Sequence, residues 1–228
     1  MTGLIAAAVF FVLLHLLVSG TGLRGAMVRR IGEGPYMGLF SLASVGGLVW
    51  LGWAYGQVKG AGPVYWDLGP GARHTAVALM LLALLLAVPG LLTPNPTSVK
   101  QEGALDRPDA VKGMLRITRH PFLWGVAIWA FAHLLANGDL PGVILFGSLL
   151  VLAVFGTASI DAKRRKALGA KWDAFAGQTS GVPFAAILGG KQTLALGEIG
   201  WWRLLLAIVV WAALLWGHPI LFGVNPLG

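Results

Sequence analysis

Long apolar runs separated by short basic loops dominate this chain. The runs approach the ~20 residues that an α-helix needs to cross the hydrocarbon core of a bilayer. The pattern predicts an all-α fold, a polytopic transmembrane helix bundle of about six spans, built as one integral-membrane domain over residues 1–228. We place the spans near residues 3–22, 37–56, 75–93, 121–137, 141–160 and 203–221.

The distribution of lysine and arginine predicts the orientation of these spans. Of the 17 cationic side chains, all but Lys59 and Arg73 lie in the loops after the first, third and fifth runs or at the start of the sixth. Short cytoplasmic loops carry an excess of Lys and Arg, so we expect these three loops in the cytoplasm and both termini on the opposite side. The first run has its arginines after it, which favours a retained span over a signal peptide.

Composition supports a membrane protein and narrows its partners. The chain is 57% hydrophobic and 11% charged, whereas about 25% of the residues of a soluble domain are charged. The net charge of +8 does not indicate nucleic-acid binding, because the cations lie in short loops between spans. Membrane lipid is therefore the expected partner. The absence of cysteine excludes disulfides, thiolate ligands and cysteine nucleophiles.

A basic segment over residues 161–175, between the fifth and sixth spans, has the pattern of an amphipathic cytoplasmic helix. Leu168, Trp172 and Phe175 fall on one face of that helix. One interpretation places the helix at the level of the lipid headgroups, held there by its cationic face. The other makes it a lid over a cofactor pocket.

Two histidines lie inside apolar runs, His15 in the first and His133 in the fourth. An ionisable side chain in hydrocarbon is rare unless it faces the bundle interior and has a partner. Each imidazole is therefore either hydrogen-bonded to a neighbouring helix or a metal ligand, since imidazole is the commonest such ligand. Two histidines on separate spans could also hold one haem iron from both faces, a geometry that suits helical bundles.

Depth in the bilayer tests that pairing. At 1.5 Å per residue, His15 lies about 13 Å from the basic end of its span and His133 about 21 Å. His218 matches the depth of His133 better, although it precedes Pro219 near the outer edge, where an interfacial role is equally reasonable. His74, beside Arg73 at the edge of the third span, is expected to be a solvated interfacial residue.

The sequence Arg119-His120-Pro121 opens the fourth span. Proline suits the first turn of a helix, where its missing N–H costs little. The motif is therefore either a structural helix start or a site for an anionic group of a cofactor, because both Arg119 and a helix N-terminus favour negative charge.

These motifs together resemble the NnrU membrane family, which is similar to the 15-cis-zeta-carotene isomerases of plants and cyanobacteria. The matching stretches are distributed over nearly the whole chain: His15-Leu-Leu-Val-Ser-Gly20, Asn95-Pro-Thr-Ser98, Arg116 to Gly125, Ala132 to Asp139, Thr179 to Phe184 and His218-Pro219. The resemblance implies haem b held by His15 and His133. It also implies either a role in nitrite and nitric oxide metabolism or haem-dependent cis-trans isomerisation, with a small apolar or gaseous ligand. Together with the distribution of Lys and Arg, it predicts a bacterial inner-membrane protein with both termini periplasmic.

Two other classes of function remain open. Arg-His-Pro followed by a later segment ending in Pro-Phe also resembles membrane methyltransferases of the isoprenylcysteine type, which bind S-adenosylmethionine. Those enzymes carry an acidic residue near the start of that later segment, whereas here Asp161 is followed by a strongly basic run. The third hypothesis is a non-catalytic partner of another membrane protein, such as an assembly factor for a reductase.

Overall fold

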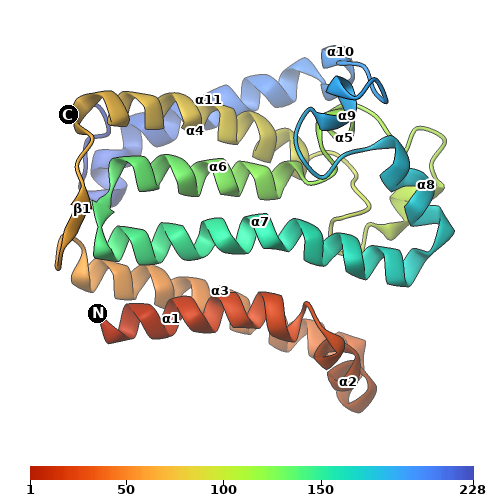
Figure 1. The fold of residues 1–228 in the computed structure, drawn as a ribbon, viewed down its shortest axis with the longest axis horizontal. Coiled ribbons are helices and arrows are strands. Elements are labelled where there is room, and N and C mark those ends of the chain that lie inside the picture. The colour runs from red at the N-terminus through yellow and green to blue at the C-terminus, as the bar shows by residue number, and fades with distance from the viewer.

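The computed structural model describes residues 1–228 as a bundle of long, roughly parallel or antiparallel helices (Figure 1). The all-α prediction is confirmed, apart from one short pair of strands. The long elements are α1 (Thr2–Leu13) with the π-helix η1 (Leu14–Val18), α3 (Glu33–Val58), α4 (Gly69–Leu91), α6 (Pro121–Ala136), α7 (Leu140–Leu168) and α11 (Trp201–Phe222). The short elements are α2 (Gly22–Ile31), β1 (Val64–Trp66), the 3₁₀ helix η2 (Glu102–Asp106), α5 (Met114–Ile117), β2 (Gly138–Asp139), α8 (Ala170–Gln178), α9 (Ala185–Leu188) and α10 (Leu196–Ile199).

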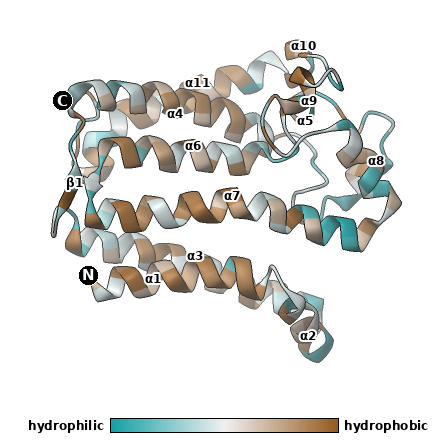
Figure 2. Ribbon diagram, viewed as in Figure 1, coloured by the Kyte–Doolittle hydropathy of each residue, from teal (hydrophilic) through white to brown (hydrophobic).

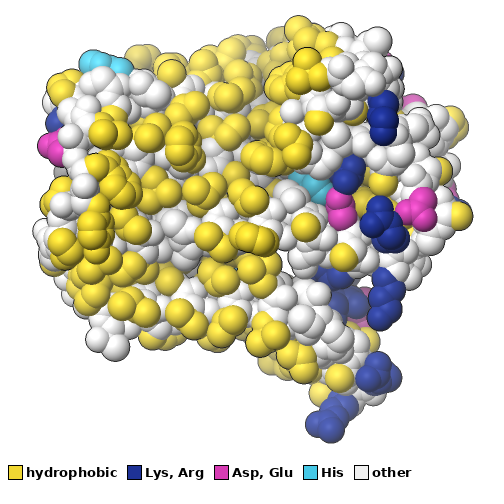
Figure 3. All heavy atoms as spheres, viewed as in Figure 1, with side chains coloured by type: hydrophobic (Ala, Val, Ile, Leu, Met, Phe, Trp, Pro, Cys, Tyr) yellow, Lys and Arg dark blue, Asp and Glu magenta, His cyan; other side chains and the backbone are white.

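The two ends of the bundle differ in structure and charge. Both chain termini lie at one end, where β1 and β2 pair antiparallel (Figure 1). The opposite end carries α2, α5, α8, α9 and α10, and most of the Lys and Arg side chains visible in Figure 3 gather there. We call this second end the basic end. The arrangement places the predicted cationic loops together on one side.

Four helices are long and apolar enough to cross a membrane: α3, α4, α7 and α11. A fifth span results only if Thr2–Val18 and Gly22–Ile31 are counted as one, and these two parts are bent by 81° from each other. The predicted fourth span is the apolar helix α6, which has 16 residues and is therefore about 24 Å long, shorter than a hydrocarbon core of about 30 Å. The structure thus supports four candidate spans where the sequence predicts six.

Helix α7 lies between α6 and α1 (Figure 1). The main buried cluster joins it to both neighbours and to α3, with Phe146 of α7 near the centre and Ala130, Phe11 and Leu51 from the other helices. Gly125 permits helices α6 and α4 to pack closely, because a Cβ at this position would lie 2.7 Å from the Ala83 carbonyl oxygen of α4. Small residues let helix backbones approach closely in this way in membrane bundles.

The outer surface of the long helices is apolar. Figure 2 shows hydrophobic residues along the helices, and Figure 3 shows them covering much of the visible side of the bundle. Large side chains such as Leu42 (72%), Trp216 (77%) and Ile220 (88%) are strongly exposed. Exposed apolar surface on this scale marks an interaction face. Together with the candidate spans, it shows a membrane protein whose helices face lipid.

The predicted helix over residues 161–175 is not one helix. Helix α7 continues through Leu168, and Gly169, whose φ is +52°, separates it from α8. Leu168, Trp172 and Phe175 do share an apolar face, but this face packs on Leu115 of α5, with Trp172 fully buried. Protein therefore covers the apolar face of the segment; that its cationic face lies at the level of the lipid headgroups stays a prediction.

At the basic end an ion pair ties α5 to α10. The Arg116 guanidinium donates to both carboxylate oxygens of Glu198, at 2.7 and 2.9 Å, and the Gly113 N–H donates to the same group at 2.9 Å. These donors hold the pKa of Glu198 below its ordinary range, with the Arg116 hydrogen bond as the main cause. Ile199, next in the chain, is buried against Met114.

We expect Glu198→Gln to lower the melting temperature at pH 7 and to have little effect in acid. Because the folded pKa is depressed, the pair stabilises the protein above the unfolded pKa of about 4.3, and this contribution is lost as the pH falls through the folded value. Melting curves of both proteins between pH 7 and pH 3 check this. A difference that persists at pH 3 would show that the pair contributes through packing and not through charge.

Candidate functional site

The most strongly connected polar group in the structure joins α6 to α7 at the basic end. Asp161 of α7 accepts a hydrogen bond from His120 Nε2 at 2.8 Å and hydrogen bonds from Arg119 Nε and Nη2. All three side chains are largely buried, with exposed fractions of 0% for His120, 14% for Arg119 and 18% for Asp161. We call this group the Arg-His-Asp junction.

Two loops surround the Arg-His-Asp junction and fix its backbone. The Arg119 carbonyl accepts hydrogen bonds from Asn95 Nδ2 and Thr97 Oγ1, both at 3.0 Å, and the Arg119 N–H donates to the Ser180 carbonyl at 2.9 Å. Asn95 itself forms the predicted turn, since its Oδ1 accepts from the Thr97 N–H. The predicted Asn-Pro-Thr-Ser turn and the residue 179–181 loop therefore meet at Arg119.

This geometry favours the helix-start interpretation of Arg119-His120-Pro121. The sequence predicts Arg119 and His120 as cofactor-binding residues, but Asp161 and the Thr179 carbonyl already engage the guanidinium, and Asp161 engages the imidazole. Of the Arg119 and His120 side chains, His120 Nδ1 is the one nitrogen buried without a hydrogen-bond partner. That these residues hold an anionic group stays a prediction.

Sequence reasoning missed the role of Asp161. It was noted only as the acidic start of a basic run, whereas in the structure it is the shared acceptor for Arg119 and His120. One signal could have found it. Asp161 is the single carboxylate in the stretch from 140 to 172, and a lone acid at the end of a span needs a cationic partner.

His15 lies on the π-helix η1, at the basic half of the α1 segment. Its Nδ1–H donates to the Phe11 carbonyl at 2.8 Å, and its ring contacts those of Phe11 and Phe40. Nε2 is 3.4 Å from the Ser44 hydroxyl, which itself makes a shorter bond of 2.8 Å to the Phe40 carbonyl. Nε2 of His15 therefore lacks a strong partner, and π-turns are frequent at functional sites.

His133 has the same local arrangement on α6. Its Nδ1–H donates to the Trp129 carbonyl at 2.8 Å, one turn earlier, and its ring packs on Trp129 and on Phe146 of α7. No hydrogen bond is formed by Nε2. In protein metal sites a ligating histidine commonly donates its other N–H to a carbonyl, which fixes the tautomer and leaves a lone pair for the metal. Taken singly, each histidine fits that arrangement.

The two histidines lie against different parts of the bundle. Ser44 of α3 touches His15, whereas Tyr55 of α3 packs on Phe146, the ring that contacts His133. Eleven residues of helix correspond to about 16 Å. Two imidazole nitrogens on opposite faces of one metal ion lie about 4 Å apart, twice a bond of about 2 Å. Contacts eleven residues apart on α3 do not favour a shared iron, which stays a prediction.

The remaining histidines lie at the end opposite the basic end. His74, near the start of α4, is exposed, as expected for a solvated interfacial residue. His218 of α11 donates its Nδ1–H to the Val224 carbonyl at 2.8 Å and packs on Phe222. His218 is half-buried, and this hydrogen bond fits the interfacial role left open for it.

The fold and the Arg-His-Asp junction define a polytopic helical membrane protein whose polar chemistry is concentrated in a few buried histidines and their partners. The chain belongs to the NnrU family, because the family model described as NnrU protein matches residues 3–226. The resemblance predicted from the motifs is thereby confirmed.

Two plant proteins are similar to part of the chain. The 15-cis-zeta-carotene isomerase of Arabidopsis thaliana is 32% identical over 106 residues, and that of Zea mays is 33% identical over 106 residues. Each match covers 45% of this chain and 29% of the relative. The chain therefore matches less than a third of the length of these isomerases. No solved structure matches the chain.

Proposed function

We propose that this protein is a membrane enzyme that isomerises a carbon–carbon double bond in an apolar polyene of the carotenoid type. The observation that carries the proposal is the similarity to two 15-cis-zeta-carotene isomerases. Such a substrate dissolves in hydrocarbon. It would reach the protein through the apolar surface of the long helices, which is continuous with the bilayer.

The two span histidines are the residues through which we propose that the chemistry runs. Each has its Nδ1–H tied to a carbonyl and its Nε2 free of a strong partner, among aromatic rings. Aromatic faces suit a flat, conjugated hydrocarbon. Haem b, expected from the family resemblance, stays a prediction, and so do a link to nitrite and nitric oxide metabolism and a gaseous ligand.

The other two classes of function gain no support from the structure. Asp161, the acid that a methyltransferase would use, is already occupied by Arg119 and His120. A membrane protein partner, as expected for an assembly factor, remains a prediction.

The test is expression in a bacterium that accumulates 15-cis-zeta-carotene, kept in darkness so that light does not isomerise the pigment. We expect the 15-cis fraction, measured by chromatography, to fall relative to cells without the protein. His15→Ala and His133→Ala should each slow the conversion, whereas His74→Ala, at an exposed site, should not. An unchanged 15-cis fraction in cells that contain folded, inserted protein would refute the proposal.

We also propose six membrane crossings in a bacterial inner membrane, with the basic end in the cytoplasm. Both termini lie at the other end, which an even number of crossings requires (Figure 1). Helix α6 and the α1–η1 segment are too short for a bilayer of average thickness, and a short span is accommodated by local thinning at modest cost. The excess of Lys and Arg at one end supports the orientation.

Because the chain has no cysteine, single introduced cysteines report the orientation cleanly. Gly71 and Gly177 lie at opposite ends of the bundle, and at each a Cβ would meet no atom within 4 Å. A membrane-impermeant thiol reagent added to intact spheroplasts should label Gly71→Cys and leave Gly177→Cys unlabelled until the membrane is opened. The reverse pattern would invert the orientation.

A further inference from the structure

Helix α2 projects from the basic end of the molecule, beyond the side of the bundle that α1 and α3 form (Figure 1). None of its 10 residues is buried. The helix is bent by 81° from the α1–η1 segment that precedes it. Where α1–η1 crosses the bilayer, α2 therefore lies close to the plane of the membrane surface.

Contacts at both ends of α2 fix this bend. Thr21 caps the helix, because its Oγ1 accepts from the N–H two residues further on, at 3.2 Å, and donates to a carbonyl of η1 at 2.7 Å. Arg24 pairs with Glu33 at the start of α3, at 3.0 Å, and its guanidinium lies over the Tyr36 ring. Gly32, with a φ of +84°, ends α2 and lets α3 begin in a new direction.

One face of α2 carries an apolar stripe that no protein covers. Leu23, Met27 and Ile31 follow one another at intervals of four residues, which places them on one side of a helix, and they are 47%, 39% and 41% exposed. Arg30, two turns after Leu23, borders this stripe, whereas Arg29, two residues after Met27, lies on the opposite side. Both arginines are exposed and form no ion pair. An apolar stripe with cations beside it is typical of helices at a lipid–water interface.

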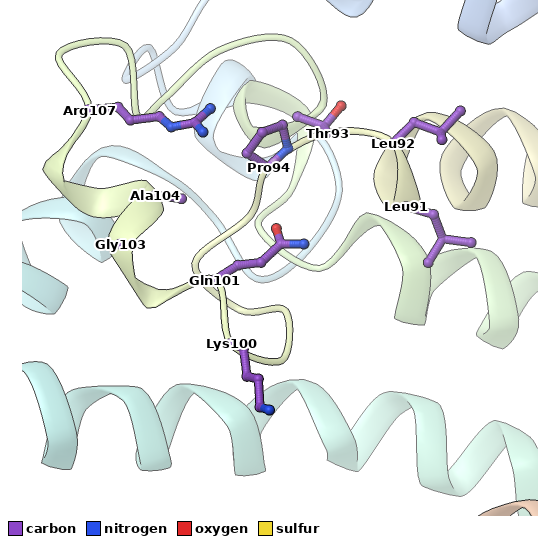
Figure 4. A pocket seen from close by; sticks show the side chains of 9 residues that line it. All are labelled: Leu91, Leu92, Thr93, Pro94, Lys100, Gln101, Gly103, Ala104 and Arg107. Carbon is purple, nitrogen blue, oxygen red and sulfur yellow. The ribbon is translucent and has the colours of Figure 1, made fainter. Parts of the chain in front are cut away.

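The loop pocket at the same end offers no comparable surface. It lies between the end of α4 and the loop that contains η2 and has a volume of about 430 Å³. Lys100 and Arg107 line it but point apart from each other (Figure 4). The cations of that pocket therefore do not converge on one ligand.

Two other positions for α2 are less favourable than the membrane surface. Within the bilayer, Arg24, Arg29 and Arg30 would lie in hydrocarbon, where charged side chains are costly. In water, the apolar stripe would stay exposed, although stripes of this kind mark interaction surfaces. At the bilayer surface the stripe leaves water, and the long Arg30 side chain reaches the headgroups along it. Anionic headgroups attract cations at this position.

We propose that α2 is an interfacial helix that anchors the basic end of the protein to anionic phospholipids. Leu23, Met27 and Ile31 lie among the upper parts of the acyl chains, and Arg30 lies at the phosphate groups. The proposal is independent of isomerase activity, but it rests on the proposed membrane crossing by α1–η1. Depth measurements on both helices separate the two placements.

Fluorophores on single introduced cysteines measure depth in the full-length protein, because the chain has no cysteine. In nanodiscs of phosphatidylcholine and phosphatidylglycerol, nitroxides near the glycerol end of the acyl chains should quench Met27→Cys most. Nitroxides near the methyl end should quench Val9→Cys most, since Val9 lies in the middle of α1–η1 and is 51% exposed. The matched control is Gly22→Cys, on the other side of α2, where a Cβ meets no atom within 4 Å. Acrylamide in the water should quench this control most.

Equal quenching of Met27→Cys and Gly22→Cys by acrylamide, with Val9→Cys deep in the bilayer, would overturn the interfacial position of α2. A shallow Val9→Cys would refute the crossing on which the proposal rests. A disulfide between two copies of Met27→Cys, in place of quenching by lipid, would overturn the proposal in favour of a second copy of this chain.

The choice of headgroup is measured with the same fluorophore on Met27→Cys, with the nitroxide carried either by phosphatidylglycerol or by phosphatidylcholine. We expect stronger quenching by phosphatidylglycerol, and Arg30→Gln should lower this preference roughly two- to fivefold. Arg29→Gln, the same change of charge on the opposite side of α2, should lower it less. Lys191→Gln removes an exposed cation of the α9–α10 loop, away from α2 (Figure 1), and should leave it unchanged. Equal effects of the three variants would overturn recognition by α2 in favour of diffuse attraction to the basic end.

Discussion

Asp161→Asn should lower the free energy of unfolding by about 3 kcal/mol, because removing one partner of a buried ion pair leaves the other charge uncompensated. The asparagine keeps the size of the side chain but removes the charge that Arg119 and His120 share. The basic ends of α6 and α7 should therefore separate more easily. Unfolding in mixed detergent micelles, followed by tryptophan fluorescence, measures the loss.

The matched control is Asp173→Asn. Asp173 also pairs with an arginine, Arg165, but both side chains are about 60% exposed, and exposed pairs contribute about 0–1 kcal/mol. The two variants make the same chemical change at the same end of the molecule. Equal stability of Asp161→Asn and Asp173→Asn would show that the Arg-His-Asp junction does not hold α6 and α7 together.

The apolar pattern predicted the helices well but not their lengths. Each predicted span corresponds to a long helical segment, because a helix in hydrocarbon must satisfy its own backbone groups. The ends depend on local contacts that periodicity does not contain. Helix α6 ends at Ala136. Directly after it, Asn137 Nδ2 donates a hydrogen bond to the His133 carbonyl, and Gly138 of β2 pairs with Trp66 of β1. α7 extends eight residues past the predicted span, through the basic run, to Gly169.

The candidate site was predicted less completely than the helices. Residue types and their depth identified His15, His133 and the Arg119-His120 pair, and the structure shows all four at least half-buried. Which of them meet is decided by the packing of helices far apart in sequence. Asp161 reaches His120 across 41 residues, a contact that no local spacing indicates. Likewise, counting residues from the basic loops put His15 and His133 about 8 Å apart in depth, and that count did not include the π-helix on which His15 lies.

The loss of haem from histidine variants is the second prediction with a large expected effect. If the purified protein shows the absorption band of a bound haem, we expect His15→Ala and His133→Ala to give different spectra, with at most one of them losing the band. The reason is that His15 contacts Ser44 of α3, whereas the Phe146 ring that contacts His133 packs on Tyr55, about 16 Å farther along the same helix. His74→Ala, at an exposed site, should leave the spectrum unchanged.

Each alternative outcome has a definite meaning. Loss of the same band in both variants, with both proteins folded, would place the two histidines on one iron. A protein without any such band would refute haem binding. The two histidines would then either act directly on the substrate through their free Nε2 atoms or stabilise the bundle as neutral imidazoles. The carotene assay of the two variants distinguishes these roles, because only a direct role predicts slower conversion by folded protein.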